Sequence, residues 1–296
     1  MIADAHNDFL TAEKCAHTRA QIVENFVKSG VKVLSCAVFT TEQNLTIEDV
    51  ERFANELEQY NKKYNIAGKQ ICKFLLSIED LGFVKTEQDL IRLIKLKPFS
   101  ATLTWNKSNQ FASGALDNGG LTYLGKKTVR VLEQNNILVD TAHLNKKSFW
   151  QFAKISTKPI YCSHANLYAL KKHKRNLTNK QIKAIVQSGG FFGVTLFQDF
   201  VSNTKISSKS IANQFKFLVN HFGNKNFGFG TDFFGISTQK LPIDVKDYSN
   251  LNLVAEQLKK QGHNDKIVKS LCFKNFVNFI NSLKKLMLLN CNFTTQ

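Results

Sequence analysis

The segment GLTYLGKKTVRVLEQNNILVDTAHL, residues 120–144, holds the pattern that decides the fold. Apolar residues recur at helical spacing over Leu121–Gln134, and Asn136–Thr141 then forms a short apolar run that is typical of a buried strand. His143 follows this strand almost at once. An amphipathic helix that leads into a fully apolar strand predicts an α/β architecture with parallel strands.

The same pattern repeats along the chain. Eight buried strands are predicted, at Met1–Ala5, Val31–Thr40, Gln70–Ile78, Phe99–Thr104, Asn136–Thr141, Pro159–Ser163, Gly190–Leu196 and Asn226–Thr231. Amphipathic helical stretches follow the strands, most clearly at Thr46–Tyr64, Leu121–Gln134, Thr178–Gln187 and Ile211–Phe222, and Leu251–Lys260 and Lys266–Leu289 end the chain as helices. Eight such units in 296 residues predict one (β/α)₈ barrel with additional C-terminal helices. Periodicity cannot show closure, so a doubly wound open sheet remains the alternative.

Composition narrows the class of protein. The formal net charge is +17, but the lysines are scattered, with KKHKR at 171–175 as the densest run, and arginine is scarce, so we expect no nucleic-acid partner. No window reaches the roughly 18 unbroken apolar residues of a membrane span, and MIADAHND is no secretory signal. The six cysteines form no CxxC motif, and four lie in apolar runs, so reduced thiols and a cytoplasmic location are expected.

Ionisable residues stand where the predicted strands end. The first strand leads to His6 and Asp8, which can face one point because alternate residues of a strand share a side. Other strands deliver Glu79, Asp140, His143, His164 and Asp232. In a barrel these strand ends meet at one mouth, where active sites lie. Apolar strands have no folding reason to end repeatedly in groups that are costly to bury unpaired, so the set predicts a functional site.

Three histidines with two or three carboxylates exceed the three protein ligands of a typical catalytic zinc ion. The number suits two metal ions that share a bridging carboxylate, and such a pair, about 3.5–4 Å apart, can hold a hydroxide and polarise a carbonyl. The residues alone therefore predict a metal-assisted hydrolase of unknown substrate. His17, His221 and His263 are expected at the solvated surface, whereas His173 is expected either to line a pocket or to be exposed.

These residues resemble the membrane (renal) dipeptidase family of metallopeptidases, which have amidohydrolase-like barrels. The resemblance runs from Ile2 to about Phe279 and implies one metal-dependent dipeptidase barrel domain over residues 1–296. It rests on six motifs in order: DAHND at 4–8, SIE at 77–79, LTWNKSNQFASG at 103–114, the segment at 120–144, PIYCSHANLYALKKHKRNL at 159–177 and FGFGTDFFG at 227–235.

The resemblance implies a role for each candidate residue. Two zinc ions per chain would be held, one by His6 and Asp8 and the other by His143 and His164, with Glu79 bridging them. Asp232 matches the family's acid/base residue. Arg175 matches the residue that grips the free carboxylate of the substrate, and a guanidinium suits that role because it binds a carboxylate with two hydrogen bonds.

Three positions depart from the family pattern. Trp105 stands where mammalian members carry a substrate-contacting His, and bacterial members with LTWN make this a subgroup trait. Trp105 is therefore expected to line the substrate site. Phe234 replaces the second Asp of a GxDFDG pattern, which is interpreted as a loss behind the metal ligands. Phe273-Lys274-Asn275-Phe276 departs from Gly-x-Asn-Phe.

The expected activity is zinc-dependent hydrolysis of small dipeptides, in which a metal-bridging hydroxide attacks, Asp232 moves the proton and Arg175 binds the carboxylate. Neither a membrane nor a nucleic acid is expected as a partner, and the resemblance allows a homodimer. Two alternatives stay open. One is another amidohydrolase-like, metal-dependent hydrolase that acts on a lactone, an amide or a phosphoester. The other is a catalytically silent binding protein on the same barrel.

Overall fold

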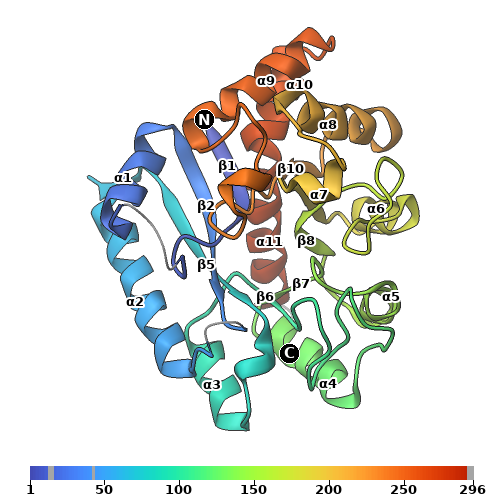
Figure 1. Ribbon diagram of the computed structural model, residues 1–296. Helices are drawn as coiled ribbons and strands as arrows, with labels where there is room; N and C mark the ends of the chain where they lie inside the picture. The colour runs from blue at the N-terminus through green and yellow to red at the C-terminus, as the bar shows by residue number, and fades with distance from the viewer. Residues whose placement is uncertain (13–16, 42–43, 292–296) are drawn as a thin grey trace.

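The computed structural model describes residues 1–12, 17–41 and 44–291, with side chains up to residue 285. Eight parallel strands close into a barrel in the order β1-β10-β9-β8-β7-β6-β5-β2 (Figure 1). Their bounds are β1 Ile2–Asn7, β2 Val31–Phe39, β5 Lys73–Glu79, β6 Ser100–Thr102, β7 Leu138–Asp140, β8 Tyr161–Ala165, β9 Phe191–Val194 and β10 Phe227–Phe229. All eight coincide with predicted strands. Closure, through the pairing of β1 with β10, excludes the open doubly wound sheet.

Helices surround the barrel (Figure 1). The main ones are α1 Arg19–Lys28, α2 Ile47–Lys63, α3 Glu87–Lys95, α4 Tyr123–Gln134, α5 Lys146–Ile155, α6 Asn179–Gln187, α7 Gln198–Val201, α8 Ser208–Phe222, α9 Leu251–Lys260, α10 Asp265–Lys269 and α11 Asn275–Cys291. Thr178 caps the start of α6, because its side chain accepts a hydrogen bond from the amide of Gln181. Within the described part of the chain, no helix combines the length and apolar character needed to cross a bilayer.

Two predicted elements begin or continue differently in the structure. The strand expected from Gln70 starts at Lys73, because residues 65–70 form a small hairpin of β3 Asn65–Ile66 and β4 Lys69–Gln70. Ala67 and Gly68 both have positive φ there, as a tight two-residue turn requires. The predicted helix Lys266–Leu289 is divided by a π-helical turn at Ser270–Lys274.

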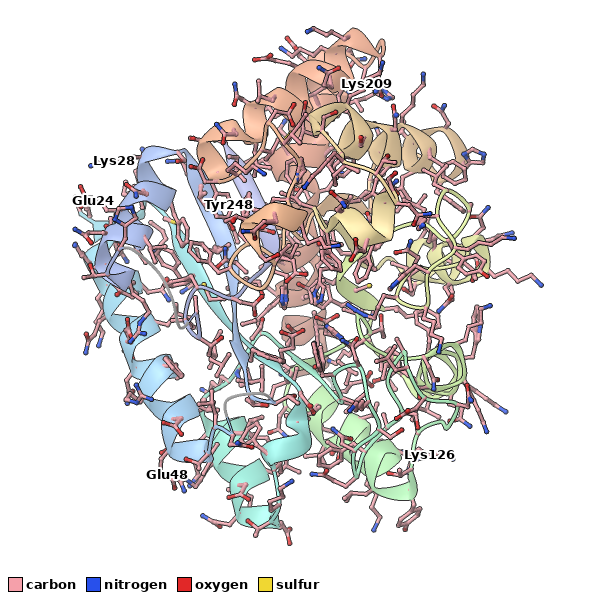
Figure 2. The ribbon with its side chains drawn as sticks, in the orientation of Figure 1. Glu24, Lys28, Glu48, Lys126, Lys209 and Tyr248 are labelled. Carbon is pink, nitrogen blue, oxygen red and sulfur yellow. The ribbon has the colours of Figure 1, made fainter. Side chains whose placement is uncertain are left out.

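Charged side chains lie mainly on the outer surface of the helices. Glu24 and Lys28 pair across one turn of α1 at 2.7 Å, and Lys126 on α4 and Lys209 on α8 are exposed (Figure 2). The basic residues are thus distributed over helices on different sides of the barrel, in agreement with their scatter in the sequence.

An aromatic cluster closes the amino-terminal end of the barrel. Phe276 and Phe279 of α11 pack with Tyr161 and Phe191, which are the first residues of β8 and β9. The hydroxyl of Tyr161 donates a hydrogen bond of 2.8 Å to the carbonyl of Ala5, the residue before His6. This hydrogen bond therefore links the aromatic cluster to β1 at the residue before His6, which the sequence places at the mouth of the barrel.

Two glycines let three strands approach closely inside the barrel. A Cβ atom on Gly193 or Gly230 would lie 1.8 Å or 1.7 Å from the carbonyl oxygen of Ser163. Neither glycine has room for a side chain, so β9 and β10 can lie close to β8 just before His164.

The described cysteines behave as small buried apolar residues. Cys36, Cys72, Cys162 and Cys272 are free and buried, as predicted for four of the six. Cys15 and the side chain of Cys291 lie outside the described residues.

Candidate active site

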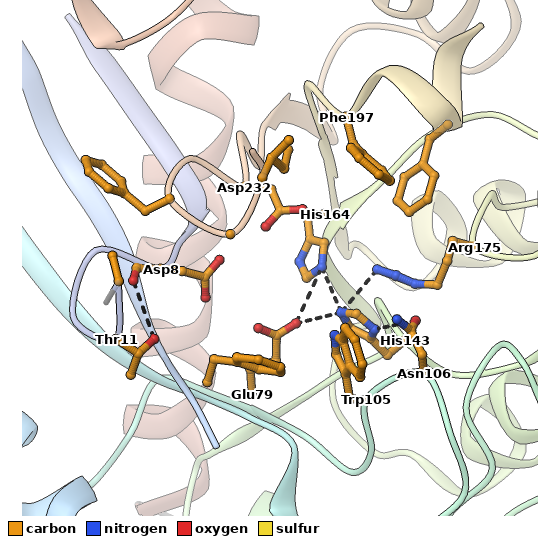
Figure 3. Close-up of a pocket in the computed structure, with 16 residues that line it drawn as sticks. Asp8, Thr11, Glu79, Trp105, Asn106, His143, His164, Arg175, Phe197 and Asp232 are labelled. Atoms are coloured by element: carbon orange, nitrogen blue, oxygen red, sulfur yellow. Dashed lines mark hydrogen bonds and ion pairs between the residues drawn. The ribbon is translucent and has the colours of Figure 1, made fainter. Parts of the chain in front are cut away.

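The predicted site residues converge at the carboxyl ends of the barrel strands (Figure 3). His6, Glu79 and His164 lie at the ends of β1, β5 and β8, and Asp8, His143 and Asp232 follow β1, β7 and β10 within three residues. Arg175 comes from the loop after β8, and Trp105 from the loop after β6. All but Asp232 and Trp105 are almost fully buried. The structure therefore brings these eight residues together, whereas Asp140, the remaining predicted strand-end carboxylate, is not among them.

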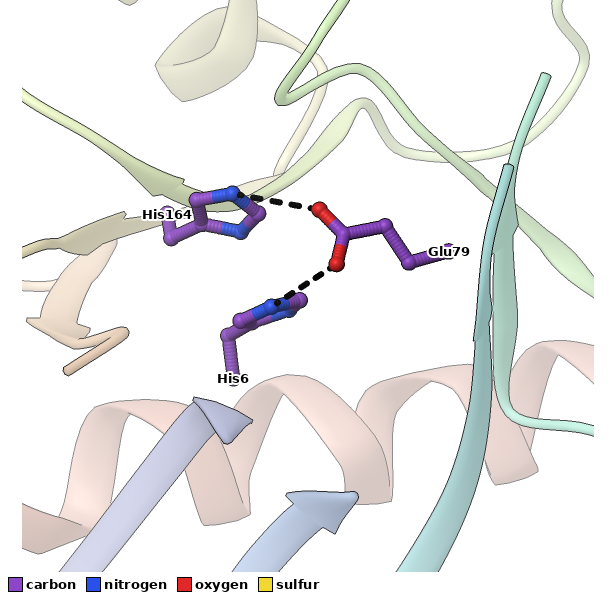
Figure 4. Close-up of side chains that lie close together, drawn as sticks. All are labelled: His6, Glu79 and His164. Carbon is purple, nitrogen blue, oxygen red and sulfur yellow. Dashed lines mark ion pairs between the residues drawn. The ribbon is translucent and has the colours of Figure 1, made fainter. Parts of the chain in front are cut away.

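Glu79 lies between the histidines that the sequence assigned to two different metal ions. Its Oε1 atom is 2.6 Å from His143 Nε2. The same atom is 3.7 Å from His164 Nε2, whereas Oε2 is 3.7 Å from His6 Nε2 (Figure 4). The two oxygens of one carboxylate thus lie near different histidines, Oε1 near His143 and His164 and Oε2 near His6. A bridging ligand needs this arrangement.

A second group of donors surrounds His6. Its Nε2 atom lies 3.3 Å from Asp8 Oδ2 and 3.9 Å from Asp232 Oδ1. The predicted convergence of His6 and Asp8 is thereby confirmed as geometry. Asp232, assigned from the resemblance to proton transfer, also lies among the potential ligands of this half.

The donor set fits metal ions. Ligand atoms of His6, Glu79 and His164 lie within 4.8 Å of one another, and so do those of His6, Asp8 and Asp232. His6 Nε2 and Asp8 Oδ1 are buried without a hydrogen-bond partner, which is costly unless a cation occupies the space between them. Imidazole and carboxylate donors together suit zinc and similar first-row ions.

Burial and neighbouring charges set the protonation of the site. Burial lowers the pKa of His164 well below its usual value, and burial with the charge of Arg175 lowers the pKa of His143 to about 3. Both imidazoles are therefore neutral, the form that binds metal. Burial opposes ionisation of Glu79, but His143 and His6 outweigh it and hold its pKa well below the usual range. Burial and the nearby Asp8 raise the pKa of Asp232 well above its usual value.

Two residues that the sequence reasoning did not assign orient the histidines. Asn106 Oδ1 lies 3.1 Å from Nδ1 of His143, and Ser163 Oγ lies 2.7 Å from Nδ1 of His164. Ser163 Oγ is also 3.4 Å from Nδ1 of His6. A partner on Nδ1 fixes the ring and turns Nε2 toward the site. Both residues stand within quoted motifs, but no spacing rule marks them as partners of a histidine.

Two of the strand-end carboxylates serve the fold rather than the cavity. Asp4 accepts hydrogen bonds from the amide and hydroxyl of Thr231, at 2.8 and 2.5 Å, and from the hydroxyl of Tyr248 (labelled in Figure 2). Asp140 accepts bonds of 3.0 Å from the amides of Ala142 and Ser163. These carboxylates join β1 to β10 and β7 to β8, and so fix the strand ends that carry the site.

The segment after β10 brings its backbone against the acidic side of the site. Asp232 and Phe234 both have positive φ, at 63° and 70°. A Cβ atom on Gly235 would lie 2.3 Å from Asp8 Oδ2 and 2.5 Å from Asp232 Oδ1, so a side chain there would displace these carboxylates. Phe234 lines the cavity, with its ring 6.1 Å from that of Phe26. It is thus part of the cavity wall, which corrects its interpretation as a loss behind the ligands.

Arg175 and Trp105 face the same cavity, of about 610 Å³. Arg175 is only 5% exposed, and its Nη2 atom lies 3.2 Å from His143 Nε2, while its Nε has no hydrogen-bond partner. It is therefore not a surface residue of the KKHKR run, although Lys172 and Lys174 are exposed. The Trp105 ring lies 6.0 Å from that of His143 and 5.2 Å from that of Phe39.

The other histidines lie apart from the ligand cluster. His17 and His221 are exposed, as expected, but His263 is half-buried. Its backbone amide donates a hydrogen bond of 3.1 Å to the carbonyl of Leu258, near the end of α9. His173 is half-buried, and its ring packs at a tilt of 37° against that of Phe200, with centroids 4.6 Å apart.

The segment Phe273-Lys274-Asn275-Phe276 keeps the Asn and the Phe of the Gly-x-Asn-Phe pattern. Asn275 and Phe276 are both buried. The Asn275 side chain donates to the carbonyls of Asn224 and Phe227, at 2.7 and 2.8 Å, and so anchors α11 beside the start of β10.

Curated proteins match between 53% and 75% of this chain. A curated Klebsiella pneumoniae protein, described as an uncharacterized protein in the pqqA 5′ region, is 29% identical over 194 residues, which cover 60% of this chain and 70% of that protein. Three further curated relatives match over between 55% and 62% of their own length.

Two solved structures share the fold. A Pseudomonas aeruginosa protein described as an amidohydrolase superposes with a TM-score of 0.79 at 20% identity, over 96% of both chains. A Rhodobacter sphaeroides metallo peptidase, liganded with a phosphinate mimic of the dipeptide L-Ala-D-Ala, superposes with a TM-score of 0.78 at 18% identity, over 95% of this chain and 98% of that one.

The membrane dipeptidase family model (peptidase family M19) matches residues 67–288, most of the chain. This chain therefore belongs to that family, and the prediction of a metallo-dipeptidase is confirmed at the level of the family.

Proposed function

We propose that the protein is a zinc-dependent dipeptidase that acts on dipeptides with a free C-terminal carboxylate. The observation that carries the proposal is the position of one buried guanidinium, Arg175, in the same cavity as a buried set of imidazole and carboxylate donors. The donor set supports metal-assisted hydrolysis. The cation supports recognition of an anionic group beside the bond that is cleaved.

His6 and Asp8 would hold one ion and His143 and His164 the other, with Glu79 between them. The distances around Glu79 support its bridging role, because Oε1 lies 2.6 Å from His143 Nε2 and Oε2 lies 3.7 Å from His6 Nε2. When bound, zinc ions at this site would lower the pKa of a water molecule and polarise the substrate carbonyl. Asn106 and Ser163 keep the imidazoles in position through their Nδ1 atoms.

Asp232 would move the proton. Its carboxylate lies beside Asp8 and His6 at the cavity surface, and burial raises its pKa, so the carboxylate can accept a proton and return it to the leaving amine. Its positive φ is consistent with a backbone held in place to present this side chain. Arg175 would hold the substrate carboxylate, which orients the scissile bond.

The charge of the cavity favours a peptide over a phosphoester. Arg175 is the only lysine or arginine among the described residues that line the cavity. A phosphate group in enzymes is usually met by several cations or backbone donors. One guanidinium matches the single carboxylate of a dipeptide.

The carboxylate clamp is tested by changing both of its partners. Charge-assisted hydrogen bonds contribute about 1.5–3 kcal/mol each. Converting the C-terminal carboxylate of a dipeptide to an amide should therefore lower kcat/KM by at least about tenfold. Arg175→Ala should cause a similar loss on the dipeptide and little further loss on the amide, which is the signature of a direct interaction in a double-mutant cycle.

Lys174→Ala is the matched control, because Lys174 is the exposed cation next in sequence. It should leave both substrates unaffected. Equal rates on dipeptides, dipeptide amides and tripeptides would remove the clamp, and the assignment would return to an amidohydrolase-like metal hydrolase of another substrate class.

A further inference from the structure

Two phenylalanines form one wall of the cavity beside Arg175. Phe197 and Phe200 both line the cavity, and their rings meet edge to face with centroids 4.7 Å apart and an interplanar angle of 85°. Phe200 is 6% exposed, whereas Phe197 is only half-buried. A large apolar side chain that stays partly exposed inside a binding cavity is a natural contact for an apolar ligand group.

The wall is tied to Arg175 on several sides. The Arg175 guanidinium lies over the Phe200 ring at 5.3 Å, and the His173 ring packs at a tilt against the same ring, with centroids 4.6 Å apart. The amide of Arg175 donates to His173 Nδ1 at 3.2 Å. Asn176, the next residue, donates a bond of 2.7 Å from its side chain to the carbonyl of Phe200. Arg175, Phe197 and Phe200 therefore form one interlocked unit.

The chemistry of an amino acid links this wall to one part of the substrate. The carboxylate carbon and the Cβ atom of the C-terminal residue are bonded to the same Cα, so they lie only about 2.5 Å apart. A carboxylate held by Arg175 therefore places the attached side chain within reach of the adjacent wall. Contact with an aromatic wall stabilises a bound apolar side chain, because it removes apolar surface from water. A cationic side chain there would be repelled by Arg175.

We propose that Phe197, supported by Phe200, is a specificity-determining residue that selects dipeptides with an apolar C-terminal side chain. This inference rests on the proposed dipeptidase function, and it names the substrate class within it. The N-terminal residue of the dipeptide would lie toward the opposite wall, where Phe234 and Ile236 line the cavity.

The test compares Ala-Gly, Ala-Leu and Ala-Lys on the zinc-loaded protein, with each enantiomer of the C-terminal residue. The wild type should cleave Ala-Leu with a kcat/KM at least about tenfold above those of Ala-Gly and Ala-Lys, as expected for several apolar groups in a hydrophobic pocket. Phe197→Ser should reduce the Ala-Leu value by about tenfold. It should change the Ala-Gly value little, because glycine has no side chain to contact the wall.

Phe234→Ser is the matched control, because it removes the same side chain from the opposite wall. It should preserve the ratio of Ala-Leu to Ala-Gly. An equal fall of both values in Phe197→Ser would leave their ratio unchanged, assign Phe197 a structural role and overturn the inference. Two unchanged values would overturn it as well. Failure of the wild type to cleave any of the three dipeptides would instead overturn the proposed function, so the two failures are distinguishable.

Discussion

Trp105 is half-buried at the edge of the active-site cavity, between the rings of Phe39 and His143. These contacts are those of a cavity wall. Trp105→Phe should therefore retain most of kcat and change KM or the preference among substrate side chains. Steady-state kinetics on a panel of dipeptides checks this expectation, with Trp150→Phe on the exposed face of α5 as the control.

A donor to the developing oxyanion would behave differently. Removal of such a donor costs about 10²–10³ in kcat. A loss of that size in Trp105→Phe, with the metal content unchanged, would show that the indole N–H takes part in the reaction.

At the scale of the element, helix α11 supports the site from the far end of the barrel. Phe276 is 1% exposed, and its ring centroid lies 4.9 Å from that of Phe191 and 5.9 Å from that of Phe99. Phe276→Ala should lower the free energy of unfolding by about 3–5 kcal/mol, because it removes buried surface and leaves a cavity. Urea unfolding followed by fluorescence and circular dichroism measures the change.

The control for this variant is Phe217→Ala on α8, where the ring is half-buried and stacks against His221. This substitution should cost clearly less. If the two variants were equally stable, the aromatic cluster would contribute no more than an ordinary surface contact.

At the scale of the whole molecule, the ligand set joins distant parts of the chain. His6, Glu79 and His164 come from β1, β5 and β8, and His143 comes from the turn after β7. Ions bound by these residues would therefore connect strands around the barrel, and they would also compensate the buried charges of Asp8 and Glu79. Chelation should lower Tm, and zinc in excess should restore it, since a ligand at 100 times its Kd stabilises a protein by about 2.7 kcal/mol.

Elemental analysis of the same samples should give close to two zinc equivalents per chain. Glu79→Gln should weaken both sites together and abolish most of the zinc-dependent rise in Tm, whereas Glu58→Gln, at an exposed position on α2, should change neither. One equivalent after saturation with zinc would contradict the binuclear site.

Much of the fold and of the ligand set was determined by the sequence itself. The eight apolar runs correspond to the eight barrel strands because a strand covered on both faces must be apolar throughout. The ionisable residues at the strand ends could be recognised because strand packing does not require them. His6, Glu79 and His164 are costly to bury unless they are paired. The motifs that contain them also carried the family resemblance, which the family model confirms.

Only the tertiary structure decided that the barrel closes, which distant side chains are hydrogen-bonded to each other and how deeply Arg175 is buried. Barrel closure depends on the contact of β1 with β10, which local periodicity does not encode. The roles of Asp4 and Asp140 depend on Thr231 and Ser163, which lie elsewhere along the chain, so Asp140 looked like a site residue in the sequence.

The sequence also did not reveal that the Arg175 side chain is buried. It stands in a run of lysines whose other members reach solvent, yet it is buried over Phe200, a residue from a different loop. A sequence records the type and order of its side chains. Which of them share a cavity is decided by the non-local packing that brings the strand ends together.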